Sequence, residues 1–248
     1  MRLPSGFEEE QKRAELPILP SGDRTFDELL GGGFRKDFVY LLYGDKKTLS
    51  DILLKTIVTS YRDQDYSQKV AFVDAMNRFN PYHISKLAVS HRLSPSKVLE
   101  SILISRAFTW EQFVELMENR LVRLEQIKMV MISGITQFWP NYKQSTFHEL
   151  LYAINGIKQT LQKLNPLLII TAPLHPYSNF KPVGGHNLTH FGQVLVLITS
   201  EERYDQYQLI QHPSRPEKTL KRYHPPPKKH RKKDERHLLH NATLDEWF

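Results

Sequence analysis

The stretch from Thr25 to Ile57, TFDELLGGGFRKDFVYLLYGDKKTLSDILLKTI, decides the fold. It predicts a short helix, a turn at Gly31–Gly33, a buried strand over Val39–Gly44, a brief loop and an amphipathic helix. We interpret the three glycines as a turn that needs positive φ angles rather than as a ligand loop, because glycine adopts such angles without steric cost. A continuously apolar strand that leads into a helix is typical of a parallel sheet covered on both faces.

Further apolar runs predict the remaining strands: Val70–Ala75, Ser101–Ala107, Met129–Ser133, Leu167–Thr171 and Gln193–Thr199. Helical spacing of apolar residues predicts helices over Glu111–Gln126 and Phe147–Leu164. The residues after Gln193 predict an antiparallel hairpin with a short charged turn. We therefore predict an α/β fold, in which a mostly parallel twisted sheet is flanked by helices and ends in that hairpin.

The loop after the first strand occupies the position where P-loop proteins hold phosphate. Such a loop reads G-x-x-x-x-G-K-[ST], and its backbone amides, lysine and hydroxyl serve phosphates and Mg²⁺. Here Gly44 is followed by Asp45, Lys46, Lys47 and Thr48, so the loop is about three residues short and lacks the second glycine. The lysines and threonine are interpreted either as a residual anion site or, as we favour, as a solvated loop.

The charge of the chain is concentrated near its C-terminus. The 248 residues carry a formal net charge of +7, with 34 Lys+Arg and 27 Asp+Glu. The segment Arg215–Arg236 alone holds +7, the last twelve residues hold −2, and residues 1–214 hold +2. This distribution argues against a protein that coats DNA with its whole surface, and favours a nearly neutral body with a basic tail.

Composition excludes other classes. The chain has no cysteine, which excludes disulfides, thiolate nucleophiles and cysteine zinc sites. The first residues contain no apolar segment of signal-peptide type, and the longest apolar runs are too short to span a bilayer, so we expect an intracellular protein without membrane contact. His186 and His190 have i, i+4 spacing, but no carboxylate lies near them in sequence, and we expect no metal site.

Four collinear segments resemble the RecA-type recombinases, specifically archaeal RadA and its paralogs such as RadB. They are LPSGDRTFDELLGGG, VAFVDAMNRFNPYHISKLAVSHRLSPSKVLESILISRAFTWEQ, IKMVMISGITQFW and KPVGGHNLTHFGQVLVLI. Together they cover roughly residues 18–212. The resemblance implies a RecA-like core, with the third segment as the Walker B strand.

Departures from the family's pattern concern the groups that hydrolyse ATP. Besides the short loop, Ser133 stands where the Walker B strand should end in Asp, and Met76 stands where a Glu should activate water. Phosphoryl transfer depends on placed charge, metal and an oriented nucleophile. We therefore expect no ATP hydrolysis and no cofactor. Asp74 remains, and we favour a structural role for it.

The family's two DNA loops correspond to Trp139–Thr146 and His175–Lys181, and both look reduced. Aromatic and basic side chains in them could stack on bases and contact phosphate: Tyr142, Lys143, Tyr177, Phe180 and Lys181. The alternative, that these are ordinary loop residues, is favoured because the body carries little net charge.

The last residues, HNATLDEWF, resemble the peptide by which repair proteins bind the sliding clamp, PCNA. One tight helical turn would place Leu244, Trp247 and Phe248 on one side as an apolar plug. Asn241 stands where the motif has Gln and reaches less deeply. The preceding basic run, read either as a spacer or, as we favour, as a phosphate-tracking arm, contains Lys228, Lys229, Arg231, Lys232 and Lys233.

These patterns predict four parts: an N-terminal arm over residues 1–19, a RecA-like domain over 20–221, a basic linker over 222–240 and a PCNA-binding peptide over 241–248. The main hypothesis is a non-catalytic adaptor for DNA replication or recombinational repair that PCNA tethers and whose core binds a recombinase or polymerase. The alternatives are a divergent DNA-dependent ATPase that uses Lys46, Lys47 and Thr48, and an inhibitor of the clamp.

Overall fold

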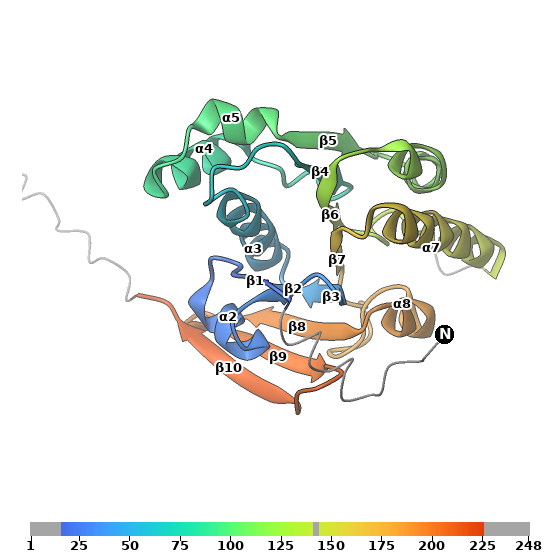
Figure 1. The fold of residues 1–248 in the computed structure, drawn as a ribbon. Helices are drawn as coiled ribbons and strands as arrows, with labels where there is room; N and C mark the ends of the chain where they lie inside the picture. The colour runs from blue at the N-terminus through green and yellow to red at the C-terminus, as the bar shows by residue number, and fades with distance from the viewer. Residues whose placement is uncertain (1–15, 141–143, 226–248) are drawn as a thin grey trace, which may run out of the picture.

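The computed structural model describes residues 16–140 and 144–225, except for the side chains of residues 144–146. Its centre is one large sheet with the strand order β10-β9-β8-β3-β7-β6-β4-β5 (Figure 1). The parallel strands are β3 (Val39–Gly44), β4 (Lys69–Asp74), β5 (Ile102–Arg106), β6 (Ile127–Ser133), β7 (Leu167–Ala172) and β8 (Val194–Ser200). Two antiparallel strands, β9 (Tyr204–Gln211) and β10 (Lys218–Tyr223), extend it.

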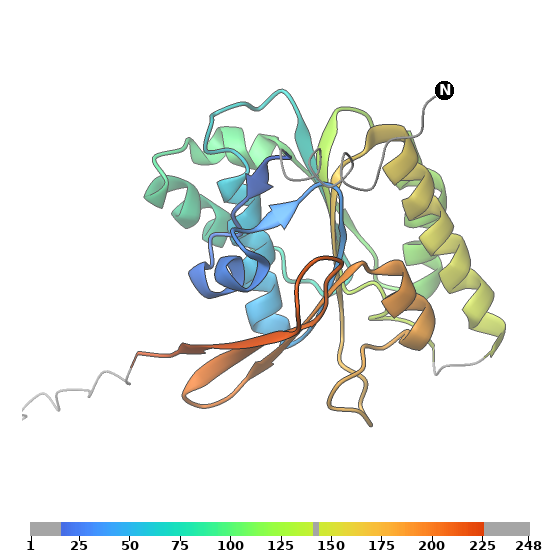
Figure 2. The ribbon, with the colours of Figure 1, turned by 60° about the horizontal axis from the view of Figure 1, so that its bottom comes forward.

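Helices cover both faces of this sheet and form two core layers (Figures 1 and 2). One layer packs against α2 (Arg24–Leu30), α3 (Lys46–Thr59), α4 (Pro81–Ser90) and α5 (Pro95–Glu100). The other packs against α6 (Trp110–Glu115), a π-helix (Leu116–Arg120), a 3-10 turn (Leu121–Arg123), α7 (Gln144–Leu164) and α8 (Gly185–Phe191). Because each central strand is buried on both faces, its sequence is a continuous apolar run.

A small second sheet closes the N-terminal side. Strand β1 (Ile18–Leu19) pairs antiparallel with β2 (Phe34–Arg35), so the folded unit begins inside the predicted N-terminal arm. Gly31, Gly32 and Gly33 have φ angles of 73°, 123° and 137°, in agreement with the predicted turn. Glycine is required at position 33, because a Cβ there would lie 2.3 Å from the carbonyl oxygen of Leu19.

The predicted fold class is confirmed, and so is the hairpin after Gln193, formed by β8 and β9. Two details differ. The helix predicted over Glu111–Gln126 begins as α6 but widens into the π-helix and ends in the 3-10 turn. Strand β10 lies within the Arg215–Arg236 segment interpreted as a basic tail, and it carries Arg222 and Tyr223 into the segment assigned to the linker. Among the described helices, none combines the length and apolar character that a bilayer crossing requires.

Candidate functional site: a capped helix at the end of strand β3

The connection between β3 and α3 is a single residue. Gly44 ends the strand, Lys46 begins the helix, and Asp45 alone lies between them. The carboxylate of Asp45 accepts a hydrogen bond from the backbone N–H of Thr48 (2.7 Å) and caps the helix. The free amides of a helix N-terminus are what a phosphate-binding loop offers to an anion. Here a carboxylate of the chain itself takes one of them and adds a negative charge.

The backbone of strand β8 contacts this connection directly. Gly44 has φ 119°, and a Cβ at its position would lie 1.9 Å from the carbonyl oxygen of Ile198. The same carbonyl accepts a hydrogen bond from the backbone N–H of Asp45 (2.8 Å). The strand therefore ends in direct backbone contact with β8, and Asp45 alone remains before α3, which is too short a connection to wrap a triphosphate.

A cavity of about 700 Å³ lies beside the first turns of α3. Its lining includes Lys47 and Thr48 but not Lys46, so the structure separates the two predicted lysines. The remaining polar lining comes from α3, from the segment around the start of α4 and from the ends of β8–β10: Ser50, Asp51, Lys55, Arg78, Asn80, His83, Ser200, Asp205, Arg222, Tyr223 and His224.

Most charges around the cavity are already paired. Asp51 lies 2.6 Å from the Lys55 ammonium and 3.3 Å from the His83 imidazole, and His224 lies 3.1 Å from Asp205. The cavity is therefore a mixed-charge surface rather than a cluster of free cations.

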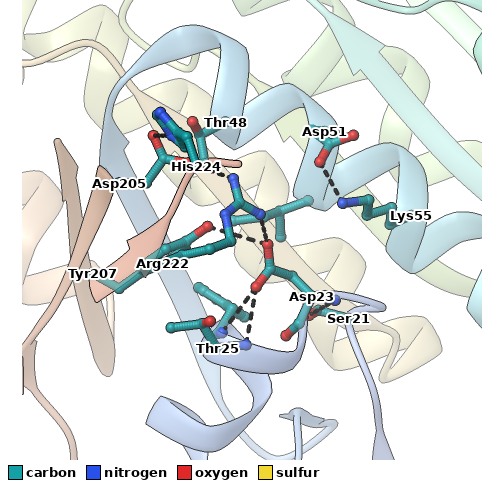
Figure 3. A network of polar contacts seen from close by, with 12 residues as sticks. Ser21, Asp23, Thr25, Thr48, Asp51, Lys55, Asp205, Tyr207, Arg222 and His224 are labelled. Atoms are coloured by element: carbon teal, nitrogen blue, oxygen red, sulfur yellow. Dashed lines mark hydrogen bonds and ion pairs between the residues drawn. The ribbon is translucent and has the colours of Figure 1, made fainter. Parts of the chain in front are cut away.

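The strongest polar feature near it is an ion network that joins α2, β9 and β10 (Figure 3). The guanidinium of Arg222 bridges the buried carboxylates of Asp23 and Asp205. The Tyr207 hydroxyl donates to Asp23 (3.1 Å), and the other oxygen of that carboxylate caps α2 through the N–H groups of Thr25 and Phe26 (3.1 Å each). The network therefore holds β10 against the rest of the domain.

Hydrogen bonding sets the ionisation of Asp205. Burial alone would raise the pKa of this carboxyl, but hydrogen bonds from Ser200, Arg222 and His224 outweigh burial and lower the pKa. Asp205 is thus a carboxylate at neutral pH, held in place by its partners. Sequence reasoning missed this network because Asp23 and Arg222 are 199 residues apart, and no local pattern pairs them.

The residues at the Walker B and general-base positions meet at the carboxyl edge of the sheet. Asp74 pairs in register with Ser133, and the side chain of Met76 packs over Gly134, where a Cβ would lie 2.5 Å from its Cγ. The fully buried Asp74 carboxylate accepts from the N–H groups of Arg78 (3.0 Å) and Phe79 (2.9 Å), as a turn-stabilising carboxylate does. The Ser133 hydroxyl is buried and has no hydrogen-bond partner among the described residues.

The predicted second DNA loop folds on itself. The N–H of His175 donates to the carbonyl of Lys181 (2.8 Å), and the Tyr43 hydroxyl donates to the carbonyl of Phe180 (3.1 Å). Tyr177 and Phe180 are 92% and 68% exposed, so the loop presents two aromatic rings beside Lys181. Of the first loop, Tyr142 and Lys143 lie outside the described residues.

The predicted tail sites also lie outside the described residues. They are Lys228, Lys229, Arg231, Lys232 and Lys233 of the basic run, and Asn241, Leu244, Trp247 and Phe248 of the plug.

The two histidines with i, i+4 spacing, His186 and His190, lie close together, with their Nε2 atoms 2.6 Å apart. Within residues 16–140 and 144–225, no group of three or more His, Asp or Glu side chains could hold a metal ion.

Comparison with known proteins assigns the family. The Rad51 family profile matches residues 12–167, which is more than half of the chain. The chain belongs to the Rad51 family. Its fold is that of a RecA-like core, since it resembles a crystal structure of the RadB recombinase with a TM-score of 0.71, over 82% of this chain and 94% of that one, at 20% identity.

Curated relatives of this Rad51-family chain are named for DNA repair and recombination. The chain is 23% identical to the human meiotic recombination protein DMC1/LIM15 homolog, over 75% of this chain and 62% of that protein. It is 27% identical to the Drosophila melanogaster DNA repair protein Rad51 homolog (73% and 60%) and 24% identical to RadB of Pyrococcus horikoshii (69% and 75%). The chain thus spans less than two thirds of the first two relatives.

Proposed function

We propose that the chain is a non-catalytic RadA/RadB-like paralog that PCNA tethers as an adaptor in DNA replication or recombinational repair. The observation that carries the non-catalytic part is the one-residue connection at Asp45. Its carboxylate takes an amide that a nucleotide phosphate would need, and a connection of one residue is too short to wrap a triphosphate. The same negative charge would repel a phosphate at this helix end.

The other catalytic positions support the same proposal. Met76 has no proton-accepting atom for an attacking water, and the buried Ser133 carries no charge to organise Mg²⁺. Asp74 already uses both carboxylate oxygens in backbone hydrogen bonds. To restore phosphoryl transfer, the chain would need a longer loop after Gly44, a general base in place of Met76 and a carboxylate in place of Ser133. We therefore assign the domain a binding role.

The tethering part depends on the C-terminal peptide. Leu244, Trp247 and Phe248 would fill one apolar pocket on the clamp, where buried aromatic anchors supply most of the binding energy. The core would then present a recombinase or polymerase partner at the clamp. The names of the relatives support a repair or recombination setting.

A calorimetric titration of PCNA with the full chain tests the tether. We expect binding by the full chain, no measurable binding by a chain truncated after His240, and a loss of at least about 30-fold for Trp247→Ala. The matched control is Leu239→Ala, which removes an apolar side chain from the same tail outside the plug and should bind as the unaltered chain does. Unchanged binding by the truncated chain would refute the tether.

Two experiments separate the alternatives. A divergent ATPase that uses Lys47 and Thr48 should retain nucleotide through purification, and chromatography of the denatured protein would detect it. A clamp inhibitor should act through its tail alone, so the isolated peptide 241–248 would suppress clamp-stimulated DNA synthesis as strongly as the full chain. The adaptor proposal predicts no bound nucleotide and requires the core for its effect.

A further inference from the structure

The segment 75–99 carries positive charge and no acidic residue. It contains Arg78, Lys86, Arg92 and Lys97 and neither Asp nor Glu, so it holds +4. Residues 1–214 hold +2 in all, so the rest of that body holds −2. Helices α4 and α5 lie in this segment. The body is therefore not evenly neutral, because its positive charge is concentrated on one pair of helices.

These four cations are exposed and have no carboxylate partner. Within the described part of the chain, none of them forms an ion pair. Lys97 contacts only an aromatic ring, since its ammonium lies 6.0 Å from the centre of the Tyr66 ring. On the neighbouring helix α3, the Asp51 carboxylate is already held by Lys55 and His83. The charge of α4 and α5 is thus left uncompensated by the fold.

Helix α4 also presents apolar side chains to solvent. It packs on the core through Ile84 and Ala88, which are fully buried. The opposite side carries Tyr82, Lys86 and Val89, whose i, i+4, i+7 spacing places them in one row about 10 Å long. Tyr82 is 80% exposed and Val89 is 65% exposed. We call this row the α4 stripe. It combines two apolar side chains with a central cation.

The α4 stripe is remote from the other sites of the chain. Figures 1 and 2 show α4 and α5 at the edge of the molecule, with α3 between them and strands β8–β10. The cavity beside α3 is lined by His83 and Asn80, but Tyr82, Lys86 and Val89 are not part of its lining. The stripe therefore faces solvent rather than the position of the nucleotide.

The composition of the stripe selects the kind of ligand that it can hold. A nucleic acid backbone would use the cations but would leave Val89 in water. A purely apolar helix would bury Val89 and Tyr82 but would also remove Lys86 from water without a partner, which costs free energy. A helix with one apolar side and flanking carboxylates satisfies both kinds of side chain, because ion pairs surround an apolar contact.

We propose that the α4 stripe docks an acidic amphipathic helix of a partner protein. Its apolar side would pack on Tyr82 and Val89, and its carboxylates would pair with Lys86 and with Arg92 just beyond the end of α4. Two packed helices lie about 8–10 Å apart, which brings flanking side chains of both within reach of one another. The inference rests on the binding role proposed for the core, and it names the face and the chemistry of that partner.

Fluorescence anisotropy with the full chain tests the docking surface. The probe is a labelled 18-residue peptide of glutamate and leucine with leucines at helical i, i+3, i+4, i+7 spacing, and the control peptide has the same composition without an apolar row. We expect saturable binding of the probe alone. Lys86→Glu should weaken it by about tenfold or more, and Tyr82→Ala by roughly fivefold.

Two control variants match these substitutions. Lys36→Glu reverses an exposed lysine in the turn between β2 and β3, and Tyr152→Ala removes a tyrosine of α7 that is 54% exposed. Both should bind the probe as the unaltered chain does, and thermal unfolding shows that each variant is folded. Absence of saturable binding, or equal affinities of Lys86→Glu and Lys36→Glu, would overturn the proposal.

A labelled DNA duplex distinguishes a nucleic-acid surface from a protein-docking surface. If Lys86→Glu weakens binding of the duplex as much as binding of the peptide, and Tyr82→Ala affects neither, the proposal is wrong. A chain truncated after His240 should bind the peptide normally, and Lys86→Glu should bind PCNA normally. Failure of the docking surface and failure of the tether are therefore separate results.

Discussion

Replacing Arg222 by Met should expose how strongly β10 depends on one guanidinium. The side chains of Asp23 and Asp205 are 1% and 4% exposed, whereas that of Arg222 is 31% exposed. Removing the cation leaves two buried carboxylates uncompensated, and breaking such a pair costs about 3–5 kcal/mol. Because water reaches the guanidinium and both carboxylates keep other donors, we expect a loss of roughly 3 kcal/mol in the free energy of unfolding.

Urea unfolding at pH 7 measures this loss, and Lys221→Met is the matched control. It removes a neighbouring cation from the exposed face of the same strand without leaving a buried charge, and it loses only the contact of the Lys221 ammonium with the Tyr204 ring (4.2 Å), so its cost should stay under about 1 kcal/mol. If Arg222→Met costs no more than Lys221→Met, the guanidinium does not anchor β10 and the reasoning is refuted.

Acidification provides a second test of the same network. The pKa of Asp205 is lowered in the fold, so its stabilising contribution is present above the unfolded pKa and is lost as pH falls through the folded value. In Arg222→Met the Asp205 carboxyl loses a hydrogen bond that lowers its pKa and should protonate more readily, which relieves part of the uncompensated charge. The stability difference between the two proteins should therefore shrink between pH 7 and pH 4, and a constant difference would contradict the electrostatic explanation.

Two further predictions concern the helix layers. Gly156→Ala should destabilise the fold by about 1–3 kcal/mol in urea unfolding, because the added Cβ would lie 2.3 Å from the Met117 carbonyl oxygen; a stabilised variant would show that α7 does not approach this backbone. Burial lowers the pKa of Lys128 to about 8, so the unfolded chain binds more protons above that pH and stability should rise from pH 8 to 9.5. Lys128→Met should remove this rise, and persistence of the rise would assign it to another group.

Strands buried on both faces could be predicted almost to the residue. Burial on both sides selects a continuous apolar run, and β3 and β7 show the pattern clearly. Strand β10 could not be found this way, because KTLKRY has one apolar side chain that packs on the core, Leu220. Its pairing is fixed by Arg222 and two distant carboxylates, which a local pattern cannot reveal.

The sequence alone reveals which residues of the family's nucleotide-site pattern are missing from the candidate site. It does not reveal which contacts the structure makes in their place. The missing glycine and the substitutions at Met76 and Ser133 are visible in the sequence. That Asp45 caps α3, and that β8 contacts the backbone at Gly44, depends on strands paired across about 150 residues. The basic excess near the C-terminus was likewise interpreted as a tail, although Arg222 belongs to the folded sheet.

The most direct test of a non-catalytic core is ATP turnover by the full chain, measured with Mg²⁺ in the presence and absence of single-stranded DNA. Variants Lys47→Ala and Lys46→Ala form a matched pair, since only Lys47 lines the cavity beside α3. We predict no turnover above background and no difference among the three proteins. Mg²⁺-dependent turnover that Lys47→Ala abolishes and Lys46→Ala retains would contradict the account.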